Sequence, residues 1–366
     1  MKKVKLSKNP TVSVKKGAVD SVVRHQIYLQ RYAGTNASQI LGFVKKLKKE
    51  LVSSLGDTNT VLSAARYTKQ LNSMKVLAKD LTKDLVATQK DELVGLAKYE
   101  ADFTKRLLDK TTIESTEELL FETVTPSVTQ LKTAAFTSVM DKEIGSTLGK
   151  TVGDALGDYG KKIAGGMVQE VRTGFALGKT TDEIADGISA IGGSAIRGYE
   201  ATALARTITN HISAMAREET YAQNADIIES YQIVATLDDV TTEECGARDG
   251  DIVDIDGAEL PPYHWNCRTT FISVIKEEYR LDIPDGNRPA KGDDGEERVS
   301  GKTDYNSWLK SQPASFQDDI LGKVKGDLFR NGGMDMKDFV DHNYQPIDLK
   351  DLKDKDNAHI FDRHGL

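Results

Sequence analysis

Apolar residues recur every three to four positions through the first third of the chain. One stripe spans residues 40–51, and a second spans residues 71–85 and continues towards Leu107. This spacing places apolar side chains on one face of an α-helix. The remaining positions carry mainly Lys, Glu, Asp and Gln, and no proline interrupts residues 11–125. We therefore predict an antiparallel helical bundle over residues 20–135.

The flanking residues predict where the first of these helices begins and ends. Asn36 or Ser38 offers a side-chain oxygen that can cap the free N–H groups of a helix start. Gly56 follows the last apolar position and is a typical helix stop. The first helix is therefore expected between these residues.

Glycines recur every four residues between Gly145 and Gly157. A glycine inside a helix costs about 1 kcal/mol relative to alanine, so a compensating interaction is needed. Lys150 and Asp154 exclude a lipid setting for this segment. We expect close approach of another helix along the glycine face, with a segment ordered by a partner as the alternative. Residues 136–198 are thus predicted to form a glycine-rich helical connector.

The pattern changes from helical to alternating after residue 222. Residues 199–222 keep helical spacing and carry a second, polar stripe, whereas residues 230–237 and 269–275 have the composition and alternation of strands. A long, polar, turn-rich connection separates the two strands. A small α+β domain is predicted over residues 199–278. The polar stripe of its helix consists of Arg206, Asn210, Ser213, Arg217 and Tyr221.

The remaining residues are predicted to add helices. Residues 279–304 are rich in Gly, Pro, Asp and charge, as linkers are. Apolar anchors at helical spacing return in residues 305–345, and residues 346–366 form a polar tail. The predicted fold class is mainly α with a small α+β domain: a helical bundle, then a helix-plus-short-strands module, then a helical C-terminal segment.

Charge narrows the range of partners. The net charge of −7 argues against a protein that coats nucleic acid over its whole surface. Residues 1–19 nevertheless form a basic arm, predicted to be flexible, which offers contacts to DNA phosphates or to an acidic partner. No run approaches the roughly 20 apolar residues of a membrane span, and we expect no signal peptide. The arm contains Lys2, Lys3, Lys5, Lys8, Lys15 and Lys16.

The candidate chemistry lies around the two cysteines, which are too few for a disulfide scaffold. Cys245, His264 and Cys267 offer three zinc ligands, and Asp249 or Asp238 offers a fourth. Alternatives are a disulfide between the cysteines, a Cys-His nucleophile, or a structural lock that fills a small polar core. A nucleophile is disfavoured because no oxyanion-hole signature accompanies the pair. The lock, with or without zinc, is the preferred interpretation.

A polar network is expected to support this lock. Arg268 follows the second cysteine and presents a planar fork suited to a carboxylate such as Asp238 or Asp249. Arg206 and Asn210 lie on the polar stripe of the preceding helix. A small domain has little apolar area to bury, so such polar pairs matter for its stability.

The order of these motifs resembles a known family. A helix with ALARTITNHISAMAREETY, a strand ending in LDD, a cysteine, a DG turn and PPYHWNCRTTF follow one another within residues 180–275. This order is similar to the phage Mu F-like family of minor head, or head morphogenesis, proteins of tailed bacteriophages, and residues 303–339 look like the tail of such proteins. The family's C-x-x-C and C-R-C each lack one cysteine here. The matching positions are Arg206, Thr207, Asp238, Cys245, Asp249, Gly250, His264, Cys267 and Arg268.

The resemblance implies a structural protein and not an enzyme. It would occur in few copies inside the capsid, after a stay in the host cytoplasm, and would bind the portal protein and capsid or scaffold proteins. Its basic arm would contact double-stranded DNA without sequence preference. The alternative is a metal-dependent hydrolase or a toxin-like enzyme that uses Cys245, His264 and Cys267.

Overall fold

The computed structural model is mainly helical with a few short antiparallel strands, which confirms the predicted fold class. None of the helices in the part of the chain it describes is long and apolar enough to cross a membrane. Lys2, Lys3, Lys5, Lys8 and Gly145 lie outside the described residues. The described residues are 6–7, 9–56, 59–114, 121–140, 149–193, 195–257, 259–283, 286–354 and 356–366.

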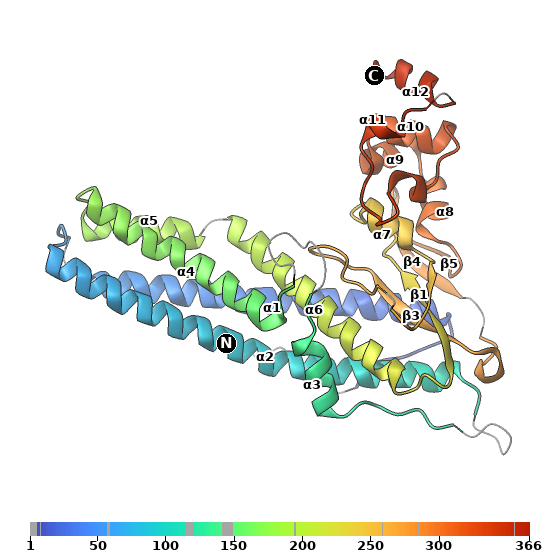
Figure 1. Cartoon of the computed structure of the whole chain (residues 1–366), viewed down its shortest axis with the longest axis horizontal. Coiled ribbons are helices and arrows are strands. Elements are labelled where there is room, and N and C mark those ends of the chain that lie inside the picture. The colour runs from blue at the N-terminus through green and yellow to red at the C-terminus, as the bar shows by residue number, and fades with distance from the viewer. Residues whose placement is uncertain are drawn as a thin grey trace.

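Long helices form a bundle along the long axis of the molecule, and the C-terminal third rises from one end of it (Figure 1). Apolar residues of these helices share one core that includes Leu47, Leu96, Ile163 and Ile208. Residues 136–198, predicted as a connector, therefore contribute two helices to the bundle itself. The bundle helices are α1 (Ala18–Leu55), α2 (Ala64–Thr111), α3 (Val128–Thr137), α4 (Val152–Ala176), α5 (Thr181–Gly193) and α6 (Ala195–Ala222).

Helix α1 begins far before the predicted start. Asn36 is a buried residue in the middle of the helix and does not cap it. Hydrophobic spacing did not predict the first turns of α1, because their buried face includes the polar residues Asp20, His25 and Gln26. The predicted stop is confirmed: Gly56 follows the last helical residue with φ of 82°, a conformation that glycine adopts without strain.

The glycine repeat brings α4 close to α2. A Cβ atom at Gly153 would lie 2.8 Å from the end of the Lys90 side chain, and one at Gly157 would lie 4.0 Å from Val86; at Gly160, one turn beyond the repeat, it would lie 2.6 Å from Thr82. All three neighbours belong to α2, so close helix approach is confirmed for this face. Gly149 serves differently, because it precedes the helix and has φ of 67°.

A three-stranded antiparallel sheet with strand order β2-β1-β3 packs against the end of the bundle. Both faces of its central strand contact other elements. Tyr231 packs with α6 residues, whereas Val234 on the same strand packs with Phe103 of α2 and Val23 of α1. The strands are β1 (Ile228–Val234), β2 (Ile252–Val253) and β3 (Thr270–Ile275).

The segment predicted as a linker, residues 279–304, is instead structured. The short helix η2 (Glu277–Tyr279) leads into it, and it contains an antiparallel hairpin of β4 (Asn287–Gly292) and β5 (Gly295–Ser300). Its polar composition was misleading because two of its arginines, Arg288 and Arg298, pair with buried carboxylates. Arg288, for example, is only 4% exposed.

The C-terminal helices pack over this hairpin around Trp308 and Phe339. The predicted polar tail, residues 346–366, joins the same core through Leu352, Ile360 and Phe361. Its few apolar residues are too widely spaced to form the periodic pattern that predicts a packed helix. The remaining helices are α7 (Glu243–Arg248), α8 (Tyr305–Lys310), α9 (Ala314–Leu321), α10 (Lys323–Asn331), η3 (Met336–Phe339), α11 (Leu349–Leu352) and α12 (Ala358–Arg363).

The described part of the basic arm is attached to the bundle. Val12 is buried with Phe103 and other bundle residues, and Lys110 Nζ donates a hydrogen bond to its carbonyl oxygen at 2.5 Å. Lys15 and Lys16 are exposed. The expectation of a flexible arm therefore fails for the residues around Val12, because an apolar side chain anchors them.

Candidate functional site

The polar stripe of α6 covers the outer edge of strand β3. Asn210 Nδ2 donates to the carbonyl oxygens of Cys267 and Thr269, at 3.2 and 3.0 Å. Further along the helix, Arg217 donates to the Phe271 carbonyl, and the Tyr221 hydroxyl accepts from Ser273 N–H. An edge strand exposes unpaired backbone groups that must find partners. The predicted stripe thus holds the chain after Cys267 in place against the bundle.

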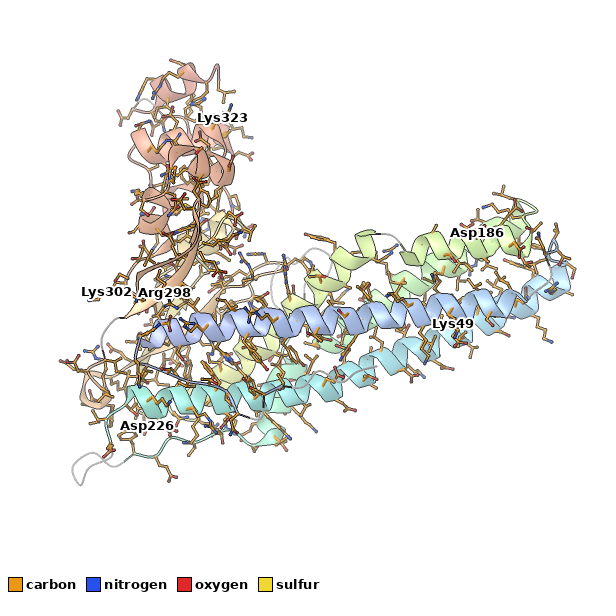
Figure 2. The ribbon with its side chains drawn as sticks, turned by 180° about the vertical axis from the view of Figure 1, so that it is seen from behind. Lys49, Asp186, Asp226, Arg298, Lys302 and Lys323 are labelled. Carbon is orange, nitrogen blue, oxygen red and sulfur yellow. The ribbon has the colours of Figure 1, made fainter. Side chains whose placement is uncertain are left out.

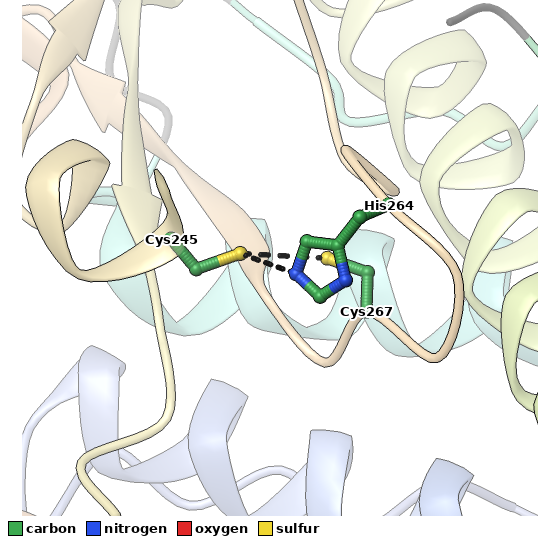
Figure 3. A group of neighbouring side chains, drawn as sticks. All are labelled: Cys245, His264 and Cys267. Carbon is green, nitrogen blue, oxygen red and sulfur yellow. Dashed lines mark hydrogen bonds between the residues drawn. The ribbon is translucent and has the colours of Figure 1, made fainter. Parts of the chain in front are cut away.

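The two cysteines and His264 meet beside this edge (Figure 3). Cys245 Sγ lies 3.1 Å from His264 Nε2 and 3.8 Å from Cys267 Sγ, and both thiols are buried. All three potential ligand atoms lie within 4.8 Å of one another. The structure therefore brings together three of the four residues predicted for the lock.

Local hydrogen bonds orient the side chains of the cluster. Thr242 caps α7 by accepting a hydrogen bond from Cys245 N–H at 3.3 Å, and its hydroxyl lies 3.1 Å from His264 Nε2. His264 Nδ1 lies 2.9 Å from the Trp265 carbonyl oxygen. A carbonyl can only accept, so Nδ1 carries the proton and Nε2 is the nitrogen that faces the thiols. A hydrogen bond of this kind on the far nitrogen also orients histidines that bind metals.

The pKa values of the two thiols are shifted in opposite directions. Burial raises the pKa of Cys245 well above its ordinary value, and the neighbouring Cys267 raises it further. Burial acts in the same direction on Cys267, but hydrogen bonds from Cys245 and His264 prevail and hold the pKa of Cys267 well below the ordinary value. Burial lowers the pKa of His264, yet the Cys267 thiolate outweighs this and raises it to about 9. Of the two thiols, Cys267 therefore has the lower pKa.

The sulfur–sulfur distance fits a zinc ion, whereas the sulfur–nitrogen distance is about 0.5 Å shorter than a tetrahedral site requires. Zinc bonds of about 2.3 Å to sulfur and about 2.0–2.1 Å to nitrogen, at tetrahedral angles, place two sulfurs about 3.8 Å apart and sulfur and nitrogen about 3.6 Å apart. The observed distances from Cys245 Sγ are 3.8 Å to Cys267 Sγ and 3.1 Å to His264 Nε2. Within the described residues, the cluster comprises these three groups and no carboxylate. A bound zinc ion would thus need a fourth ligand such as water.

Asp238 and Asp249 do not join the cluster. Asp238 forms a two-pronged ion pair with Arg268, as the sequence suggested, with Arg268 Nη2 2.7 Å from Oδ1. Arg206 Nη1 donates to the Asn266 side chain at 3.0 Å. The predicted network therefore fixes the backbone on both sides of Cys267.

Asp249 was expected at the metal and is found elsewhere. Its carboxylate accepts 2.7 Å hydrogen bonds from Ala235 N–H and Tyr305 N–H and forms a two-pronged ion pair with Arg288, at 2.9 Å on each side. Both side chains are at most 4% exposed. Asp249 thus joins strand β1, the hairpin and α8. The Asp249–Arg288 pair escaped prediction because Arg288 lay in the supposed linker.

A second buried ionic cluster joins the bundle to the sheet. Glu100 of α2 is fully buried, its Oε2 lies 2.6 Å from His25 Nε2 of α1, and its Oε1 pairs with Arg217 of α6. Sequence reasoning missed it, although Glu100 interrupts an otherwise apolar helix face. That charge at a core position was the available signal.

Comparison with known proteins bears on the same region. Residues 166–272 match the model of a family described as phage Mu protein F like protein. The predicted resemblance is confirmed for this Mu F-like segment. It runs from α4 to β3 and includes the whole thiol and histidine cluster. No curated protein and no solved structure matches the chain.

Proposed function

We propose that this chain is a minor head protein of a tailed bacteriophage, present in few copies inside the capsid. It binds the portal and neighbouring capsid or scaffold proteins during head assembly or genome packaging. The match of residues 166–272 to the phage Mu F-like family carries this proposal. The long bundle supplies the surface for protein partners, and the basic arm supplies contacts to packaged DNA.

The arrangement of the cluster supports an architectural role. Cys267 is fully buried, and the α6 stripe ties the backbone around it to the bundle. A nucleophile must reach its substrate, which a fully buried thiol does not do. The cluster therefore acts as the lock of the α+β module and not as a nucleophile.

Quantitative mass spectrometry of purified procapsids and mature virions tests the proposed function. A few copies per particle in both are expected. Presence in procapsids alone would identify an assembly factor that is lost on maturation. Absence from both kinds of particle would refute the proposal.

Zinc is part of the proposed lock. Cys245, His264 and Cys267 would hold the ion, which would supply bonds that fix α7 to the loop before β3. We expect about one zinc per purified chain, measured by elemental analysis, and loss of that zinc in Cys267→Ser. If the wild-type chain purifies without zinc and does not take zinc up when it is added, the zinc proposal is refuted and the lock consists of hydrogen bonds alone.

A metal-dependent hydrolase remains the second candidate, favoured by one observation. A cavity of about 410 Å³ lies beside the cluster and is lined by Cys245, His264, Arg206 and Arg268. In the lock proposal, His264→Ala lowers the free energy of unfolding by about 1–3 kcal/mol because buried partners lose their hydrogen bonds. In the enzyme alternative, the same variant abolishes an activity and leaves the melting curve nearly unchanged.

A further inference from the structure

A groove of about 450 Å³ lies between α2 and α4, in the half of the bundle that is farther from the sheet. The two helices run side by side there, as the close approach of Gly153 and Gly160 to α2 requires (Figure 1). Leu81 of α2 and Ile163 of α4 belong to the bundle core, so the groove lies on the outer side of the pair. The small or apolar residues that line it are Ala78, Thr82, Ala164, Gly165 and Val168.

Every charged residue that lines this groove is a cation. Lys161 lies 3.3 Å from Asp158, whereas the other four have no carboxylate within 4 Å in the part of the chain that the structure describes. Asp80 and Asp84 also lie on α2, outside the lining. Even when they and Asp158 are counted, cations exceed carboxylates by two, so the groove keeps an uncompensated positive charge. The cations are Lys75, Lys79 and Lys83 on α2 and Lys161 and Arg172 on α4.

One glycine of the groove has no packing role inside the fold. Gly165 is exposed, and a Cβ atom there would meet nothing within 4 Å, whereas one at Gly160 would lie 2.6 Å from Thr82. A glycine inside a helix costs about 1 kcal/mol relative to alanine, and no close contact within the chain offsets that cost at Gly165. The close approach of another molecule would offset it.

The spacing of the lysines suits a partner helix. Lys75, Lys79 and Lys83 are four residues apart, so they form one row along the flank of α2. The row lies beside Ala78 and Thr82, which are buried. In helical assemblies, charged rows of this kind flank an apolar seam and pair with opposite charges on the neighbouring helix. The groove therefore has the pattern that a further helix needs, with cations on both of its flanks.

Nucleic acid fits this lining less well. Phosphate groups would pair with the cations but would offer nothing to the apolar residues between them. The bases of a single strand bind proteins largely by stacking on aromatic side chains, and the lining of the groove contains none. An acidic amphipathic helix offers both kinds of group, because small apolar side chains and carboxylates lie on adjoining parts of its surface.

We propose that this groove binds an acidic amphipathic helix of a partner protein. Small apolar side chains of that helix lie over Gly165 and Val168, and its carboxylates pair with the lysine row on one flank and with Arg172 on the other. The site goes beyond the proposed head function, since the argument uses this chain alone. Where that function holds, the helix belongs to a head partner.

Fluorescence anisotropy with the purified full-length chain tests the site directly. The probe is a labelled peptide of about 18 residues, long enough to hold helical structure in water, with alanine and leucine on one helical face and glutamate on both flanks. A peptide with glutamine in place of every glutamate and a labelled DNA duplex are compared with it at about 0.15 M salt.

Three variants change the groove in different ways. Lys79→Glu and Arg172→Glu each reverse one exposed charge, one on each flank, and the only hydrogen bond lost is the 3.4 Å bond from Arg172 to Gln169. Gly165→Ala keeps every charge and adds a Cβ atom where the fold leaves open space, so it remains informative if a charge variant fails to fold. The matched control is Lys49→Glu, which makes the same charge change on α1, the helix nearest the viewer in Figure 2.

We expect the glutamate peptide to bind wild type best and each groove variant to weaken it about five-fold or more. A charge reversal replaces an ion pair by a repulsion of similar size, and the added Cβ atom overpacks the interface. The control should bind like wild type. Four results would overturn the proposal: no binding of the glutamate peptide; equal loss in Lys49→Glu; tighter binding of the duplex; or self-association of wild type that Lys79→Glu abolishes, which would assign the groove to a second copy of the chain. None of them bears on whether the chain is a virion component.

Discussion

Replacing Asp249 by alanine should unfold the junction between the sheet, the hairpin and the C-terminal helices. The substitution removes both prongs of the ion pair with Arg288 and the acceptors for Ala235 N–H and Tyr305 N–H. The side chains of Asp249 and Arg288 are 1% and 4% exposed, so the remaining guanidinium keeps its charge in a buried site without a carboxylate, with hydrogen bonds only to the carbonyl oxygens of Thr303 and Ala235. Removing one member of such a buried pair costs about 3–5 kcal/mol.

Urea unfolding followed by tryptophan fluorescence measures this cost locally. Trp308 is fully buried in α8, and its indole N–H donates to Glu297 of the hairpin at 2.7 Å, so its emission reports this junction once the other tryptophan, Trp265, is replaced by Phe. Asp102→Ala is the matched control. It breaks an ion pair with Arg106 whose side chains are 40% and 42% exposed. Such exposed pairs contribute about 0–1 kcal/mol.

A double-mutant cycle separates the pair from its surroundings. Adding Arg288→Met to Asp249→Ala removes the unpaired charge, so the double variant should lose less stability than the two single variants combined. The reasoning fails if Asp249→Ala destabilises the junction no more than the exposed control does. Strict additivity of the two single changes would also refute it.

Two further predictions concern glycines of the bundle, and a third concerns the loss of stability at low pH. Gly174→Ala should destabilise the protein by about 1–3 kcal/mol, because the added Cβ would overlap Ile184. Gly165→Ala should stabilise it by up to about 1 kcal/mol, because a Cβ there would meet open space and alanine favours the helix. Thermal melts measure both changes. Burial raises the pKa of Glu100, but the charges of His25 and Arg217 outweigh it and lower that pKa to about 2. The stabilisation from Glu100 is therefore complete above its ordinary pKa near 4.5 and is lost as pH falls from there towards 2. Glu100→Gln should be destabilised at neutral pH and should lose this part of the acid dependence; an unchanged acid profile in urea titrations would contradict the assignment.

Sequence periodicity predicted the elements whose partners lie on one apolar face. The stripes of α1 and α2, the Gly56 stop and the polar stripe of α6 depend on spacing within one segment, and they were predictable for that reason. The meeting of Cys245 with His264 was also foreseeable, because a short connection limits the distance between them. Their exact geometry needed α7, which Thr242 caps.

The failures have a common physical cause. The start of α1, the hairpin and the C-terminal tail bury polar or isolated apolar residues whose partners come from distant parts of the chain. Arg288, for example, looks solvated until Asp249 is placed beside it, 39 residues away in sequence. Hydrophobic spacing carries no information about such pairs, since each member is polar by itself.

The contacts at the start of α1 set an order of events during synthesis. Asp20 pairs with Arg298, which is 278 residues later, and Asn287 N–H donates to the Lys16 carbonyl oxygen. At about 5–20 residues per second, a ribosome adds Arg298 on the order of 15–55 s after Asp20. The contacts at the start of the first helix therefore cannot form until most of the chain has left the ribosome. A nascent chain stalled before the hairpin would leave this end of α1 open to chaperones, whereas a longer one whose hairpin has left the ribosome would form these contacts.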